Sequence, residues 1–221
     1  MSMAGAALRW IWALLASLTL FAVPVHSHPH VFVDGGVDFV LGDGSTLEAL
    51  RVTWLYDEFE TLYILSSNGL SLTPDGGLNE EDRQSLTRLQ SDLPSDFAGS
   101  AHLSVAGEPV ALGRPKGLDA DIVDGRLHVT FTRDLLEPLD LRTSTAEVAF
   151  YEATYFYAFA VTDTPQLEGD ALGCAATVIP FDPDTQDTAL QAALAKLSRE
   201  ETPDAEEIGA FFADRIVLQC A

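Results

Sequence analysis

The chain has 221 residues and carries 34 acidic against 12 basic residues, which gives a formal net charge of −22 at pH 7. A surface of this sign repels nucleic acid and anionic lipid and attracts cations, so the composition excludes nucleic-acid binding as an expected function. For most of these carboxylates the simpler explanation is that they keep an exported protein soluble.

Residues 1–27 are expected to form a signal peptide. Arg9 precedes an uncharged apolar run over residues 10–23, which suits a signal-peptide core and is short for a membrane span. The residues of Val25-His26-Ser27 resemble a cleavage site, so we place cleavage after Ser27, with an uncleaved anchor as the alternative. Residues 28–221 would then form a single soluble, periplasmic domain.

The mature chain begins with a predicted hairpin. Apolar residues alternate from His30 to Leu41, with Gly35-Gly36 as an expected bulge, and a Gly-rich turn leads into a second strand over residues 47–56. Asp57 and Asn79 are suitable N-caps for two helices, 58–65 and 80–93, the second with Leu86, Leu89 and Leu93 on one face. The two helices and the loop between them constitute a predicted helix-loop-helix insertion over residues 57–100.

The second half of the chain is rich in predicted strands. Residues 101–132 contain short alternating runs with a tight turn at Asp124-Gly125, and the aromatic-rich residues 146–161 resemble one bent or two paired strands. Cys174 lies in a further strand, residues 184–198 and 203–210 are candidate helices, and residues 215–220 form a closing strand. The expected fold class is therefore α+β, with an antiparallel, sandwich-like sheet core, the helix-loop-helix insertion and a C-terminal helix-strand closure.

Both cysteines, Cys174 and Cys220, lie in the mature part of the chain. Outside the cytoplasm they are expected to form a disulfide that fixes the C-terminal strand to the rest of the domain. Two free buried thiols, or a cysteine metal site, are the alternatives.

The new N-terminus would place metal-binding groups close together. The amine and imidazole of His28 can form a chelate and His30 adds a second imidazole, a nitrogen set that suits Zn, Ni, Co or Cu. A square-planar N-terminal copper or nickel motif needs a backbone N–H at the second residue that can be deprotonated, and Pro29 has none. We therefore expect a brace-like site, in which the N-terminal amine and two imidazoles bind the ion together with a carboxylate from elsewhere in the chain. Asp34 or the Asp57-Glu58 pair are the candidates for this carboxylate. The alternative is two solvated histidines. His102 and His128 are isolated, and ordinary structural roles are expected for them.

The loop between the predicted helices has the register of an EF-hand. Residues 71–82 place Asp75 at position five, Gly76 at the sharp turn and Asp82 at position twelve, and Asp75, Asn79 and Asp82 are the candidate calcium ligands. Position one is Ser71, and the bidentate Glu of position twelve is replaced by a shorter Asp. Calcium binding is therefore expected to be weak or lost, and the loop is otherwise a capped helix-loop-helix connection.

The order of motifs resembles the DUF1007 family over nearly the whole mature chain. The motifs that carry the resemblance are His28-Pro29-His30-Val31, residues 54–59 (WLYDEF), the EF-like loop, residues 151–156 (YEATYF), and Gly173-Cys174 with a terminal cysteine. The chain departs from the family where Glu152-Ala153 replaces an Asp-Pro pair, and where Ser71 and Thr73 stand in a loop that is more completely Asp/Asn-rich in family members. Glu152 keeps the carboxylate, so either a contribution beside the histidines or a structural hydrogen-bond role is expected.

The resemblance implies a periplasmic component of an ABC-type transport system of unknown mechanism, often encoded beside nickel/cobalt-type permeases. The leading hypothesis is a non-enzymatic accessory protein that binds a divalent transition metal ion through His28 and His30 and works with an inner-membrane metal permease. A protein-interaction or assembly factor for such a permease is the second hypothesis, and a CopC-like copper carrier is a variant of the first. An N-terminal-histidine copper oxidase is a third class, but the sequence has no Ser-His-Asp order, cysteine nucleophile or phosphate loop, so no enzyme activity or enzyme substrate is expected.

Overall fold

The computed structural model describes residues 29–94, 97, 99–185 and 207–221. The predicted signal peptide, His28, the predicted helix from residue 186 onward and the first part of the candidate helix 203–210 lie outside these residues. Strands dominate the described part, which also contains two α-helices, α2 (Glu58–Ser67) and α3 (Glu80–Ser91). No helix in this part of the chain is long and apolar enough to span a bilayer.

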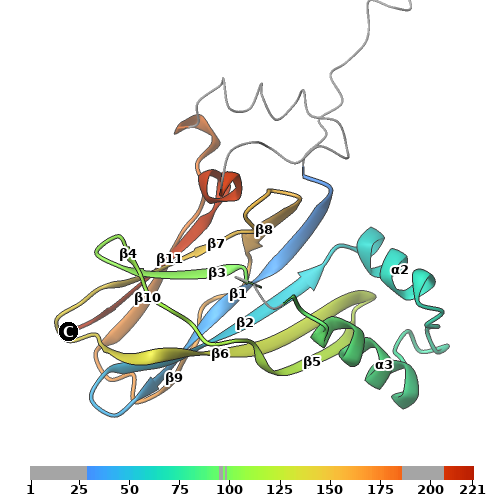
Figure 1. The fold of residues 1–221 in the computed structure, drawn as a ribbon, viewed down its shortest axis with the longest axis horizontal. Helices are drawn as coiled ribbons and strands as arrows, with labels where there is room; N and C mark the ends of the chain where they lie inside the picture. Colours follow the sequence, from blue (N-terminus) through green and yellow to red (C-terminus); the bar gives the residue numbers. More distant parts are fainter. Residues whose placement is uncertain (1–28, 95–96, 98, 186–206) are drawn as a thin grey trace, which may run out of the picture.

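The first sheet has six strands in the order β5-β6-β2-β1-β8, and β9 also pairs with β1 (Figure 1). Their bounds are β1 Val31–Gly42, β2 Thr46–Tyr56, β5 Lys116–Val123, β6 Arg126–Asp140, β8 Tyr157–Val161 and β9 Leu167–Gly169. β8 and β9 run parallel to β1 and occupy the same edge of it one after the other. The sheet is therefore mixed, and the prediction of a purely antiparallel core is wrong for this edge.

The second sheet has five strands in the order β10-β11-β7-β3-β4, all antiparallel. Their bounds are β3 Ala101–Val105, β4 Glu108–Pro109, β7 Ala146–Phe150, β10 Cys174–Ile179 and β11 Asp214–Cys220. Fully buried side chains of both sheets, such as Phe39 and Phe131 of the first and Phe150 and Ile216 of the second, belong to one hydrophobic cluster. Burial of this shared apolar surface is the main stabilising contribution that holds the sheets together.

The expected bulge at Gly35-Gly36 is absent, because β1 and β2 stay in register there, with Gly35 opposite Trp54. The register shifts instead between Val40 and Leu41, beside the hairpin turn. Gly35 is required for a different reason: a Cβ at this position would lie 2.1 Å from the carbonyl oxygen of Thr53. Gly35 thus marks a close approach of two backbones.

The aromatic-rich residues 146–161 form two strands that are not paired with each other. β7 lies in the second sheet between β11 and β3, whereas β8 lies in the first sheet beside β1. The prediction of one bent or two paired strands is corrected accordingly. Residues 151–156 carry the chain from one sheet to the other.

The two helices lie together at one end of the first sheet, where α3 packs on β5 and α2 contacts β6 (Figure 1). Asp57 and Asn79 are the N-caps, as predicted, and both helix ends differ from prediction by two residues. Leu86 is fully buried, but Leu89 is 40% exposed, so the predicted apolar face of α3 is only partly buried. Buried Thr61 joins α2 to β6: its Oγ1 accepts a hydrogen bond from the Leu127 amide at 2.9 Å.

Two short 3-10 helices, Pro183–Thr185 and Ile208–Phe212, flank the gap before β11. The second overlaps the end of the candidate helix 203–210. The closing strand is confirmed as β11, which lies between β10 and β7.

Candidate functional site

His30 is half-buried immediately before β1 and is held by the turn that precedes β8. Its amide donates to the carbonyl oxygen of Phe156 at 2.9 Å, and its ring centroid lies 4.9 Å from that of Phe156. The Nε2 atom of His30 is buried. The position and the direction of the chain at His30 are thus fixed by the sheet. His28, two residues earlier, lies outside the described residues.

Asp57 connects the start of β1 to the start of α2. Its Oδ1 accepts from the Glu60 amide at 2.8 Å and its Oδ2 from the Phe32 amide at 2.9 Å, while its own amide donates to the Phe32 carbonyl at 2.9 Å. Both carboxylate oxygens therefore already accept hydrogen bonds, one of which is a helix cap. Glu58 follows as the first residue of α2 and is exposed.

Glu152 stabilises the turn that holds His30. Its carboxylate accepts from the amide and the hydroxyl of Thr154, each at 2.8 Å, and from the Phe156 amide at 3.1 Å. Tyr155, between these two donors, has a positive φ of 59°, a conformation that costs energy for a residue with a side chain. The hydrogen bonds to Glu152 offset part of this cost, which is a structural role.

The predicted metal ligands that can be located therefore lie at the same end of the first sheet, where β1 and β8 begin and β2 ends. Asp34, the other candidate, accepts from the Arg126 guanidinium at 2.8 Å. Over the residues that the structure describes, no three or more His, Cys, Asp or Glu side chains are grouped so that they could hold a metal ion.

The EF-like loop uses its candidate ligands to start α3. Asn79 Oδ1 accepts from the Asp82 amide at 2.9 Å, and Asn79 Nδ2 donates to Asp82 Oδ2 at 2.9 Å. Asp75 is exposed, and a hydrogen bond from the Thr73 side chain lowers the pKa of its carboxyl group. Asn79 thus caps the helix, and Asp82 holds the Asn79 side chain in place.

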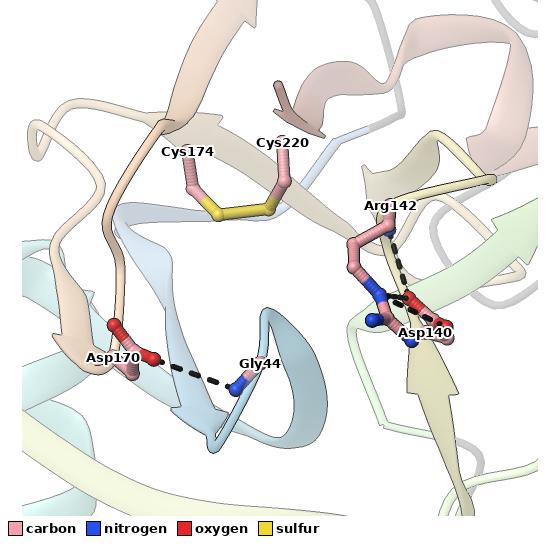
Figure 2. The surroundings of a disulfide bond; sticks show 6 residues. All are labelled: Gly44, Asp140, Arg142, Asp170, Cys174 and Cys220. Atoms are coloured by element: carbon pink, nitrogen blue, oxygen red, sulfur yellow. Dashed lines mark hydrogen bonds and ion pairs between the residues drawn. A yellow bond between two sulfur atoms is a disulfide. The ribbon is translucent and has the colours of Figure 1, made fainter.

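The disulfide predicted between Cys174 and Cys220 is present (Figure 2). The two residues are directly opposite on β10 and β11, with Cα atoms 3.9 Å apart. Figure 2 also shows Asp170, whose carboxylate accepts from the Gly44 amide at 3.4 Å and so connects the β1–β2 turn to the segment before Cys174. The disulfide therefore fixes the end of β11 to a segment that contacts the first sheet.

An aromatic pocket beside Glu152 was not predicted. It has a volume of about 340 Å³, and five aromatic side chains line it together with Glu152, Ser100 and residues of the segment after α3. The five aromatic residues are Trp54, Tyr56, Phe97, Tyr157 and Phe159. The Trp54 indole N–H donates to the Ser100 hydroxyl at 2.6 Å, which satisfies its polar atom.

Strand pairing explains how distant residues form this pocket. Tyr56 of β2 and Phe159 of β8 both pair with Val33 of β1, from opposite sides, and Tyr157 pairs with Val31 in the same way. Trp54 and Tyr56, like Tyr157 and Phe159, are two residues apart, so each pair lies on one face of its strand. The period-two aromatic spacing was visible in the sequence, but the pairing of β8 with β1 was not.

Comparison with known proteins identifies relatives without a described function. The family described as "Protein of unknown function (DUF1007)" matches residues 13–220. A protein of Haemophilus influenzae, described as uncharacterized, is 22% identical over 199 residues, which cover 89% of this chain and 92% of that protein.

Proposed function

The chain belongs to the DUF1007 family, and from this premise we propose that it is an exported, non-enzymatic accessory protein that binds a divalent transition metal ion at its mature N-terminus. Its partner is an inner-membrane metal permease of the nickel, cobalt or zinc class, to which it delivers the ion or from which it receives it. The ion is cargo and has no catalytic role.

The observation that carries this proposal is the fixed position of His30. The His30 amide is hydrogen-bonded to Phe156, whose own amide is held by Glu152, so the chain leaves the sheet at a defined point. An N-terminal His28 would be only two residues from this point. Ligands that are held in place in this way lose less conformational entropy on binding than those of a free tail.

The state of the carboxylates favours a site in which nitrogen ligands dominate. Both oxygens of Asp57 and of Glu152 accept hydrogen bonds from the backbone, so binding a metal there would break contacts that hold α2 and the turn before β8. Exposed Glu58 is the carboxylate of this set that can move without such a loss. Amine and imidazole ligands suit Zn, Ni, Co and Cu, and a copper carrier of the CopC kind is the same mechanism with another metal.

Calorimetric titration of the processed protein with Zn, Ni, Co and Cu tests this proposal. The His28→Ala/His30→Ala double variant is the main comparison, and His128→Ala is a matched control on β6. We expect one-to-one binding that is lost in the double variant and kept in the control. Equal binding by wild-type protein and the double variant would contradict the proposal, as would no binding by protein that intact mass shows to begin at His28.

A role as an interaction or assembly factor is the second candidate, because large apolar side chains are exposed at the start of α2. Phe59 is 89% exposed, Tyr63 65% and Leu62 58%, and Phe32 of the neighbouring β1 is 55% exposed. A patch of this kind is typical of a protein-protein contact. Full metal transport by cells that produce the double histidine variant, with transport lost in a Phe59→Ser/Tyr63→Ser variant, would favour this second function over the first.

A further inference from the structure

The aromatic pocket has the size and enclosure of a small-molecule site. Its volume of about 340 Å³ lies within the roughly 300–1,000 Å³ that is usual for ligand pockets. Trp54 and Tyr56, which form part of its wall, are only 6% and 8% exposed. The pocket is therefore a recess in the edge of the protein core, and a ligand there would contact mainly aromatic rings.

The rings are tilted with respect to one another. The Trp54 ring makes interplanar angles of 90° with Tyr56, 69° with Phe97 and 55° with Phe159, at centroid distances of 5.9–6.3 Å. At these distances the rings pack against one another edge-to-face or tilted, and all four line the pocket. The negative faces of aromatic rings attract cations, most strongly for tryptophan.

The charged groups around the pocket are carboxylates and one guanidinium, and the carboxylate of Glu152 lies in its wall. Among the described residues that line it, Glu152 is the one charged residue, and none of them is a lysine or arginine. Burial and the charge of the nearby Glu60 raise the pKa of both Tyr56 and Tyr157, so both phenols are neutral at pH 7. Arg133 approaches the backbone at Gly99, but it does not line the pocket and donates to the carbonyl groups of Leu112 and Gly113.

We propose that this pocket binds a small organic cation with a methylated ammonium group, held by the aromatic walls and the negative charge of Glu152. The hydrogen bonds of Glu152 decide the kind of cation. Its two oxygens already accept from Thr154 and Phe156, so they offer charge but little remaining capacity for strong donors. A primary ammonium group has three N–H donors that need acceptors, whereas a quaternary ammonium group has none.

This site needs no bound metal ion, although it shares Glu152 with the turn that holds His30. A bare divalent ion requires several oxygen or nitrogen ligands close together, whereas most of the described lining is aromatic or apolar and the carboxylate of Glu152 is already hydrogen-bonded. The inference therefore does not depend on metal binding by His28 and His30, and each can fail without the other.

Choline and its uncharged isostere 3,3-dimethyl-1-butanol test the inference directly, because they have nearly the same shape and differ in charge. The chain has three tryptophans, and Trp10 and Trp12 lie in the predicted signal peptide, so the fluorescence of processed protein reports on Trp54 alone. Titrations are made at constant ionic strength and repeated by calorimetry. We expect saturable binding of choline at least about 10-fold tighter than that of the isostere, consistent with a desolvated cation–π contribution. Equal or tighter binding of the isostere would overturn the inference, and so would an absence of saturable choline binding.

Two variants localise the binding. Glu152→Gln removes the negative charge, and Glu137→Gln is the matched control because Glu137 is exposed on β6 and does not line the pocket. We expect choline binding to weaken at least about 5-fold in Glu152→Gln, with binding of the isostere unchanged, and neither ligand to be affected in Glu137→Gln. An equal loss for both ligands would mean that the variant disturbs the turn. Whether the pocket prefers the cation is then decided by the relative affinities of wild-type protein for choline and for the isostere. Unchanged choline binding in Glu152→Gln would overturn the role of this carboxylate.

Discussion

The disulfide between Cys174 and Cys220 is expected to contribute a large part of the stability of the protein. It closes a loop with a sequence separation of 46 residues. In the chain-entropy relation, a loop of this length restricts the unfolded chain enough to stabilise the fold by about 4 kcal/mol at 25 °C. For a domain of this size, that corresponds to a decrease in Tm of about 8–16 °C when the bond is removed.

The assay is urea unfolding of processed wild-type protein and of the Cys174→Ala/Cys220→Ala variant, followed by Trp54 fluorescence and by circular dichroism. Wild-type protein reduced before unfolding is the control, because it keeps both sulfur atoms and loses only the bond. The variant and the reduced protein should lose similar stability, with the m-value higher than in the oxidised protein because the unfolded chain becomes more expanded. A loss below about 1 kcal/mol in both would show that the disulfide contributes little, since β10 and β11 would then be held by their pairing alone.

Three further predictions concern single side chains. Thr61→Val should destabilise the protein by about 1–3 kcal/mol in urea unfolding because it leaves the buried Leu127 amide without its acceptor, and Thr61→Ser, which keeps the hydroxyl, should lose less; equal losses would contradict this. Leu86→Ala should cost about 2–5 kcal/mol, whereas Leu89→Ala, at a position 40% exposed, should cost about 1 kcal/mol or less; the reverse order would show that α3 packs on another face. Burial lowers the pKa of His102 below its ordinary value of 6.5. As the pH falls, His102 is therefore protonated in the unfolded state at a higher pH than in the folded state. The stability that His102 contributes is complete above pH 6.5 and is lost as the pH falls from there toward the pKa of the folded state. The urea midpoint should therefore fall more between pH 7.5 and pH 5 in wild-type protein than in His102→Gln, and parallel curves would argue against it.

Local features of the sequence were sufficient to predict most elements. The β1–β2 hairpin, the caps Asp57 and Asn79, the tight turn at Asp124-Gly125 and the disulfide are all present. Each of these depends on residues close together in sequence, on turn or capping chemistry, or on the tendency of exported cysteines to pair. The two glycines were misinterpreted because a bulge and a close backbone approach select the same residue.

The long-range arrangement was not predictable in the same way. Residues 146–161 read as one unit because they are uniformly aromatic, yet β7 and β8 belong to different sheets. Parallel pairing of β8 with β1 joins segments more than a hundred residues apart, and no local pattern specifies such a partner. The aromatic pocket depends on this pairing, so it could not be predicted. The carboxylates of Asp57 and Glu152 were identified as polar groups of the site, but their hydrogen-bond partners required the fold.

In the proposed function, metal binding depends on the amine and imidazole of an N-terminal His28 held next to the anchored His30. The most direct measurement compares the affinity of protein that begins at His28 with that of the same protein extended by Gly-Ser before His28, at pH 7.5 and at pH 5.5. We expect tight one-to-one binding by protein that begins at His28, and binding at least about 10-fold weaker by the extended protein. Binding should also be weaker at pH 5.5, because amine and imidazole must lose protons to bind. Equal affinity of the two proteins would contradict the claim, because the N-terminal amine would then have no part in the site.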